Sequence, residues 1–161
     1  MSVRPANFSD INPIVAIILD GHRRSHYALG SCEVDVKEAK RVLVQAIQRH
    51  GSHNLGGTWV MVCETDGRIT GFILGTLSRV GLFGDKLFAT DLFWLVSEDV
   101  APTDPVRLMK SLVGWAEANP HCIEVKCGTQ AVIGDPKKAG RVLEHLGMVP
   151  YGEIYRKEIT R

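Results

Sequence analysis

Three consecutive β-rich runs occupy residues 57–96, and they require a fold built around a sheet with antiparallel neighbours. The first two runs lie in GTWVMVCETDGRITGFILGTLSRV, residues 57–80, where the Asp-Gly of ETDGR is a strong hairpin signal. The third run, KLFATDLFWLV at residues 86–96, is apolar enough to be covered on both faces. Helical patterns lie on both sides of this block, so the sequence predicts a mixed α/β architecture.

The remaining elements are predicted from apolar periodicity and capping signals. Asp35 and Glu38 form a capping-box-like pair at the start of the second helix, and Gly147 follows the last one. The predicted helices are residues 9–22, 35–50, 106–116 and 135–147, and the predicted outer strands are residues 2–6, 122–127 and 151–160. The order is therefore β-α-α-β-β-β-α-β-α-β.

Length and composition indicate one domain, residues 1–161. The chain has 161 residues, of which 45% are hydrophobic, enough for a single core. Lys and Arg number 19 against 18 Asp and Glu, so no net charge attracts nucleic acid or an anionic membrane. The longest apolar run, near residues 13–19, is too short to cross a bilayer, and no signal peptide is recognisable; a cytoplasmic protein is expected.

Four cysteines, Cys32, Cys63, Cys122 and Cys127, show no C-x-x-C spacing. In a reducing compartment they are interpreted as buried or partly buried thiols. A zinc site through His121, Cys122 and Cys127 is a second interpretation, but adjacent residues of a strand point to opposite faces. No metal is expected.

Three stretches carry a resemblance to a known family: VRPANFSDI at residues 3–11, DGRITGFILG at residues 66–75, and LEHLGMVPYGEIYRKEI at residues 143–159. With the element order, they resemble the GCN5-related N-acetyltransferase superfamily over nearly the whole chain. LFGDKLFATDLFWLV and IYRKEI are most similar to small acetyltransferase-like proteins of phages and prophages. The resemblance implies a mostly antiparallel sheet flanked by helices, splayed near Val96 between its fourth and fifth strands.

The resemblance also implies acetyl-CoA as the acyl donor and an amine as the acceptor. The backbone of Trp94, Leu95 and Val96 corresponds to the strand that pairs with the pantetheine arm. Val106 and Arg107 correspond to the start of the helix that receives the pyrophosphate. Asp91 and Glu98 are the candidate general bases, and a structural acid is the second interpretation of Asp91.

Two positions depart from the family pattern. The family's glycine-containing turn before the third helix is replaced by SEDVAPTDP, residues 97–105, in which two prolines remove N–H donors. We expect a turn that positions the helix, with Thr103 or Asp104 as its cap and Pro105 in first position, without a full pyrophosphate cradle. The Tyr that protonates the leaving thiolate in many relatives corresponds to Leu143, which cannot donate a proton.

The segment HRRSHY, residues 22–27, stands where the resemblance implies the acceptor groove. Its candidate residues for a substrate or partner are His22, Arg23, Arg24, His26 and Tyr27. They can recognise an acidic partner, or they can form a solvated helix end whose cationic charge suits the helix dipole. Two functions therefore remain open: an N-acyltransferase with a degenerate cofactor turn, and a non-catalytic, phage-encoded or virion-associated interaction module. If acetyl-CoA is not used, no other cofactor is expected. The expected protein partners are a second copy of the chain or a phage protein.

Overall fold

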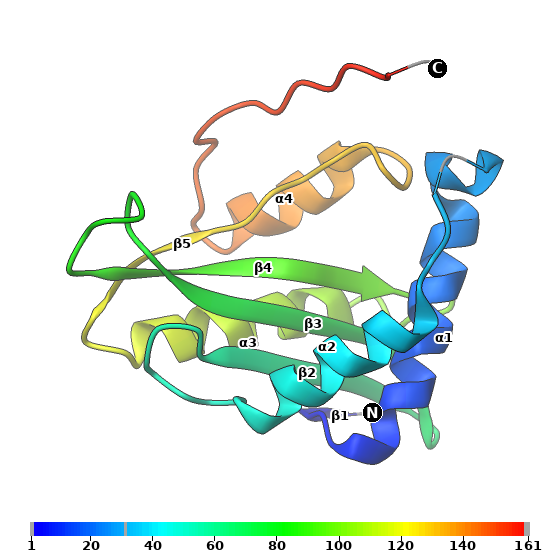
Figure 1. Ribbon diagram of the computed structural model, residues 1–161, viewed down its shortest axis with the longest axis horizontal. Helices are drawn as coiled ribbons and strands as arrows, with labels where there is room; N and C mark the ends of the chain where they lie inside the picture. Colours follow the sequence, from blue (N-terminus) through cyan, green and yellow to red (C-terminus); the bar gives the residue numbers. More distant parts are fainter. Residues whose placement is uncertain (1, 31, 160–161) are drawn as a thin grey trace.

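The computed structural model describes residues 2–30 and 32–159 and shows a five-stranded sheet with helices on both faces (Figure 1). The strands are β1 Ser2–Pro5, β2 Thr58–Thr65, β3 Arg68–Arg79, β4 Leu87–Val96 and β5 Cys122–Lys126. The helices are α1 Ile11–Arg24, α2 Val36–Gln48, α3 Asp104–Glu117 and α4 Pro136–His145, with 3₁₀ turns η1 Phe8–Asp10 and η2 His26–Leu29. The mixed α/β fold class is confirmed.

The strands lie in the order β1-β2-β3-β4-β5. All neighbours pair antiparallel except β4 and β5, which pair parallel. The predicted β2–β3 hairpin is present, and its Asp66 and Gly67 have φ of 51° and 75°. A tight hairpin turn requires two consecutive left-handed residues, so the hairpin predicted from the Asp-Gly pair is confirmed.

The predicted final strand, residues 151–160, is wrong over its described part. Residues 149–159 are exposed and have no regular secondary structure, and Thr160 lies outside the described residues. Figure 1 shows this segment leaving the body of the molecule after α4. A strand exists only if a neighbour accepts its backbone hydrogen bonds, and within one described chain this segment has none.

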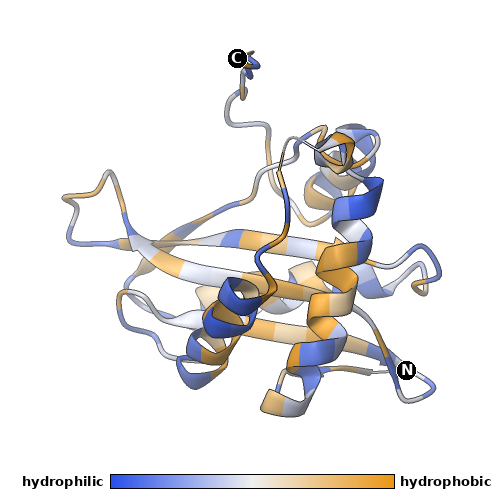
Figure 2. Ribbon diagram, turned by 45° about the vertical axis from the view of Figure 1, so that its right-hand side comes forward, coloured by the Kyte–Doolittle hydropathy of each residue, from blue (hydrophilic) through white to orange (hydrophobic). Residues whose placement is uncertain are grey.

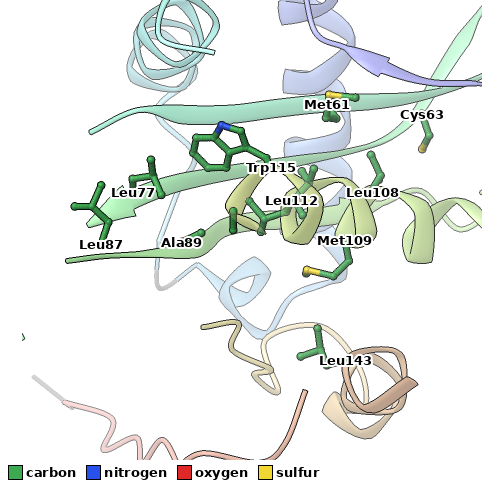
Figure 3. Close-up of a cluster of buried hydrophobic side chains, with 12 residues drawn as sticks. Met61, Cys63, Leu77, Leu87, Ala89, Leu108, Met109, Leu112, Trp115 and Leu143 are labelled. Atoms are coloured by element: carbon green, nitrogen blue, oxygen red, sulfur yellow. The ribbon is translucent and has the colours of Figure 1, made fainter. Parts of the chain in front are cut away.

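The two faces of the sheet bury separate sets of apolar side chains. Alternation along β2 sends Val60 and Val62 toward α1 and α2, and Met61 and Cys63 toward α3. Figure 3 shows the cluster that contains Met61 and Cys63. Helix α3 covers the sheet there, and Leu143 of α4 lies on the side of α3 that faces away from the sheet. Figure 2 shows apolar residues concentrated along the strands and the helices that cover them. The sheet therefore has a separate apolar core on each face.

An ion-pair network connects the N-terminal strand to the start of α1. Arg4 contacts Asp10 at 2.7 Å and Glu64 at 2.7 Å, and the Asp10 carboxylate also accepts the Asn7 N–H at 2.9 Å. The Arg4 guanidinium holds the pKa of the Asp10 carboxyl below its usual range. Arg4 therefore joins β1 to β2 through Glu64 and to the start of the first helix through Asp10.

We predict that Asp10→Asn destabilises the fold at pH 7 by about 1.5–3 kcal/mol, since it removes charge-assisted hydrogen bonds from a buried site. Because the folded pKa is lowered, this stability is present above the ordinary Asp pKa of about 3.9 and is lost as the pH falls further. Urea unfolding at pH 7 and pH 3 measures the difference. Glu38→Gln, which disrupts the exposed pair with Arg41, is the control and should leave the stability nearly unchanged, because solvent screens this pair. Equal effects of the two variants at pH 7 would contradict the network's importance.

Candidate functional site

Strands β4 and β5 diverge partway along their length, and this split is the candidate site. Their last paired residues are Thr90 and Lys126, whereas β4 continues to Val96. On its other edge, β4 has a register irregularity between Leu74 and Gly75 of β3. Such a bulge bends a strand and increases its twist, which turns β4 away from β5. We call residues 91–96 and the facing residues 127–132 the β4–β5 split; it lies where the splay was predicted.

The backbone of β4 presents polar groups to the split that no strand pairs with. Ser97 N–H donates to Thr70 O at 2.9 Å, and hydrogen-bonding positions alternate along an antiparallel ladder. The N–H and C=O groups of Trp94 and Val96 therefore point away from β3, toward the open side. Arg24 confirms this direction, because its Nη2 donates to Val96 O at 2.9 Å. The split thus offers an open strand edge inside the molecule.

Asp91 lies where the two strands separate. Its Oδ1 accepts the Gly128 N–H at 3.3 Å, so the carboxyl bridges the mouth of the split. Burial raises the pKa of the Asp91 carboxyl, although the Gly128 N–H opposes the shift. Burial and the nearby Asp91 charge also raise the pKa of the Cys127 thiol to about 12. Asp91 can accept a proton here, while Cys127 stays a neutral thiol.

Glu98, the other candidate base, is not brought together with Asp91. It is exposed on the turn after β4, at the opposite end of the split. At about 3.3 Å per residue, the strand places the two carboxyl groups roughly 20 Å apart along the chain. Only Asp91 combines burial, a raised pKa and a position at the strand separation.

The turn between β4 and α3 is held by its own side chains. Ser97 Oγ donates to Thr70 O at 3.0 Å and contacts Asp99 at 2.7 Å, and Asp99 pairs with Arg68. The Arg68 guanidinium lowers the pKa of the Asp99 carboxyl. A carboxylate is therefore fixed in the turn before α3.

The start of α3 differs in detail from the expectation. Thr103 precedes the helix but makes no side-chain capping hydrogen bond, and Pro105 is the second helical residue, because the helix begins at Asp104. The predicted side-chain cap is therefore wrong. The reason is that the Thr103 backbone is already helical, with φ −85° and ψ −19°, so its hydroxyl does not face the first turn.

The helix start is nevertheless poorly suited to anions. The Asp104 N–H donates to Ala101 O at 3.0 Å, and Pro105 has no N–H. The Asp104 side chain is fully buried, and its Oδ1 lies 3.5 Å from the Arg107 guanidinium. Val106 is half-buried and the Arg107 side chain is 54% exposed. Of these residues, Arg107 alone adds positive charge at this end.

Residues 22–27 do not act as one cluster. Both arginines pair with Asp20 at 3.0 Å, but only Arg24 also reaches Val96 O, and the Arg23 side chain is 75% exposed. His26 N–H donates to Val132 O at 3.2 Å, and this bond holds residues 22–27 against residues 127–132. His22 Nε2 lies 2.7 Å from Cys32 O. The segment therefore covers the split, and Tyr27, 37% exposed, lies beside it.

Sequence reasoning missed three contributors to this site. Gly128 supplies the N–H to Asp91, Cys127 packs beside it, and Asp20 holds Arg24 in place. The Asp20–Arg24 pair has helical i,i+4 spacing, a signal available in the sequence. The Asp91–Gly128 contact spans 37 positions and leaves no local signal.

The position expected for a proton-donating tyrosine is part of the core. Leu143 is 8% exposed and belongs to the cluster under α3 (Figure 3). Residues 2–30 and 32–159 contain no group of three or more His, Cys, Asp or Glu side chains arranged to hold a metal ion. Within the same residues, every helix falls short of the length and apolar character of a membrane span.

Solved structures share this architecture. An acetyltransferase from Trypanosoma brucei superimposes with a TM-score of 0.67 at 16% identity, covering 98% of this chain and 99% of that one. The chain has the acetyltransferase fold. The ribosomal-protein-alanine N-acetyltransferase of Brucella melitensis biovar Abortus 2308 gives 0.67 at 14% identity, covering 99% of this chain and 100% of that one. Glucosamine-6-phosphate N-acetyltransferase from Arabidopsis thaliana gives 0.70 at 12% identity, covering 99% and 98%. No protein-family model and no curated protein sequence matches the chain.

Within the acetyltransferase fold, the half-buried Asp91 yields a stability prediction. Because burial raises its folded pKa, Asp91 favours folding only at low pH, and this contribution is lost as the pH rises through the folded pKa. Asp91→Asn keeps an acceptor for Gly128 N–H without the buried charge. At pH 7 we expect the variant to melt about 2–4 °C higher, the shift that ~1 kcal/mol produces in a domain of this size. Below pH ~3.9, where both states of Asp91 are protonated, the gain should disappear. Calorimetry at both pH values checks it, and a variant less stable at pH 7 would contradict it.

Proposed function

We propose that the protein is an acyl-CoA-dependent N-acyltransferase that holds its donor mainly along the β4–β5 split. The observation that carries the proposal is the edge of β4 that β5 leaves uncovered, where Trp94 and Val96 direct backbone groups toward a space bordered by Asp91, and where the Val96 carbonyl is bonded to Arg24. An extended ligand with amide groups binds such an edge as an added strand would, through main-chain hydrogen bonds. The pantetheine arm of acetyl-CoA has this chemistry.

Exposed apolar side chains support an occupant in the same place. Leu92 and Phe93 are 55% and 47% exposed on β4, although the strand lies inside the sheet order. Covering apolar surface contributes about 25 cal/mol per Å² removed from water. The alkyl portion of the acyl donor would cover part of this surface.

Asp91 is the proposed general base. The amine nitrogen attacks the thioester carbonyl carbon, the carbon–sulfur bond breaks, and Asp91 accepts the proton that the nitrogen loses. Its raised pKa makes it a better proton acceptor than an exposed carboxylate. Because Leu143 has no proton to give, the departing thiolate takes its proton from water. The acceptor is a primary amine, reached through the opening that residues 22–27 cover.

A second function, an interaction module without catalysis, is favoured by the start of α3. The buried Asp104 carboxylate and the missing Pro105 N–H weaken the helix end that would hold a pyrophosphate. In that case the exposed Arg23 and the half-buried His22 would contact an acidic partner. Phage origin, a virion-associated role and a cytoplasmic location stay predictions from the sequence.

Calorimetry with acetyl-CoA and S-acetylpantetheine separates the two functions. If the split holds the donor, both ligands bind, and loss of the nucleotide part weakens affinity by less than about tenfold, or ~1.4 kcal/mol. A large difference would show that the turn at residues 97–103 holds the phosphates, contrary to the proposal. If neither ligand at millimolar concentration gives a binding heat or a thermal shift, the protein does not bind the acyl donor. The acyltransferase proposal is then rejected in favour of the interaction module.

Catalysis is tested by Asp91→Asn with Glu98→Gln as the matched control. Loss of the base should lower kcat about 10²–10⁴-fold while the affinity for acetyl-CoA stays unchanged. In the wild type, kcat should rise with pH through the raised pKa of Asp91, because only the ionised carboxylate accepts a proton. Thiol release with a panel of primary amines measures the rate. If Glu98→Gln is the variant that loses activity, the assignment to Asp91 is wrong.

A further inference from the structure

The pairing of β4 with β5 limits where the acyl group of a donor in the β4–β5 split can extend. A ligand arm that follows β4 from Val96 toward Asp91 meets Thr90 and Lys126, where the two strands are paired. The acyl group must therefore turn out of the plane of the sheet. Helix α1 and the proposed acceptor opening lie on one face of the sheet, so the face toward α3 is left for the acyl group.

Asp91 points to the α3 face of the sheet. It is the register partner of Gly75, and a Cβ on Gly75 would lie 2.4 Å from the Leu112 side chain of α3. Directly opposite residues of an antiparallel pair have their side chains on the same face, so the Asp91 carboxyl is on the α3 side. The Cys127 thiol is there too, because its Sγ lies 3.5 Å from Met109 Sδ. A thioester carbon within reach of Asp91 therefore lies on this side.

A groove with a volume of about 1640 Å³ adjoins this point, and α3, β5 and α4 contribute to its lining. The lining includes Cys127 and Gly128, which also belong to the split. Ordinary ligand pockets have volumes of about 300–1,000 Å³, so an acetyl group fills only a small part of this groove. The groove is thus continuous with the candidate site and larger than acetyl transfer requires.

The part of the groove beside Cys127 has an apolar lining from three elements. Val125 of β5 lies two residues before Cys127 and so on the same face of the strand, Val113 comes from α3, and Leu143 and Leu146 come from α4. Leu143 points toward α3 in Figure 3. Val113, Val125 and Leu146 are half-buried, so part of their apolar surface is exposed to the groove. We call these four residues the apolar wall; an alkyl chain suits it, because such a chain has no polar group that needs a hydrogen bond.

The length of the apolar wall sets the length of chain that it can cover. At about 3.3 Å per residue, β5 advances about 7 Å between Cys127 and Val125. An extended chain of single bonds advances about 1.2 Å per bond, since a residue with three backbone bonds spans at most ~3.6 Å. An acyl chain that begins beside Cys127 and ends at Val125 therefore has about seven or eight carbons.

We propose that the protein transfers a medium-chain acyl group, of about eight carbons, and that the apolar wall binds its alkyl chain. This inference rests on the proposed acyltransferase function and adds the class of donor to it. The amine nitrogen attacks the carbonyl carbon, the carbon–sulfur bond breaks, and Asp91 accepts the proton from nitrogen. The thiolate takes a proton from water, so the products are a medium-chain N-acyl amide and a free thiol.

A donor series of acetyl-, butyryl-, hexanoyl- and octanoyl-CoA with one fixed primary amine tests the proposal. Complete burial of a methylene changes an equilibrium about fourfold, and the groove is open on one side. We therefore expect kcat/KM, measured by thiol release, to rise about twofold per methylene, or ~60-fold from acetyl to octanoyl. Acetyl transfer with a flat or falling dependence on chain length would overturn the inference and leave the proposed function in place. If no donor binds or reacts, the proposed function fails and the inference fails with it.

Variants of Val113 test where the alkyl chain lies. Val113→Phe fills the groove and should lower the octanoyl-to-acetyl ratio of kcat/KM about tenfold, the effect of three to four methylenes at twofold each. Val113→Ala enlarges the groove and should extend the gain to decanoyl-CoA. Gly114→Ala is the matched control, because its added Cβ meets open space and Gly114 is not part of the groove lining; its ratio should equal that of the wild type. Thermal melting checks that each variant folds. Unchanged chain-length profiles in both Val113 variants would overturn the assignment of the chain to this groove.

Discussion

The parallel pairing of β4 with β5 ends at Thr90 and Lys126, and the candidate site depends on where it ends. A parallel ladder normally satisfies both edges of a central strand. Here the bulge opposite Leu74 and Gly75 turns β4 away, so its last residues keep one edge paired and expose the other. Backbone groups that cost free energy when unpaired are thereby made available to a ligand. Helices α1 and α3 cover the two faces of the same strand.

The electrostatics of the split favour proton acceptance more than anion binding. Asp91 is shielded from water at the strand separation, which raises its pKa, while Asp99 and Asp104 place two further carboxyl groups near the start of α3. A helix start usually attracts phosphate because its N–H groups and dipole are free. In this chain the Asp104 N–H already donates to Ala101 O, and Pro105 has no N–H. Proton acceptance by Asp91 therefore does not require that the start of α3 binds a phosphate.

Most of the fold could be predicted from local signals. The Asp-Gly turn, the Asp35 cap and the apolar periodicity of the helices each fix an element within a few residues, and tertiary packing did not override them. The final strand failed because a strand is defined by a neighbour, which no pattern within residues 151–159 can supply. The Thr103 cap failed because capping depends on backbone angles that residue type alone does not determine.

The site was only partly predictable. Asp91 was chosen from the resemblance, but its burial and its contact with Gly128 come from the approach of two segments distant in sequence. Likewise, Arg23 and Arg24 are adjacent and chemically identical, and both pair with Asp20, yet only Arg24 reaches across to Val96. Helix geometry separates neighbours by about 100°, so only the placement of α1 on the sheet decides between them.

Arg24 competes with any ligand for the Val96 carbonyl in the β4–β5 split. Val96 O already accepts a hydrogen bond from the last residue of α1, and Gly21, one turn earlier, allows that helix to lie against Leu95, since a Cβ there would be 2.7 Å from the Leu95 side chain. A molecule that takes the Val96 carbonyl must therefore exchange partners with Arg24 rather than add a bond. Its binding free energy includes the cost of releasing the end of α1, and occupancy of the sheet edge becomes coupled to the conformation of the segment that leads from α1 to α2.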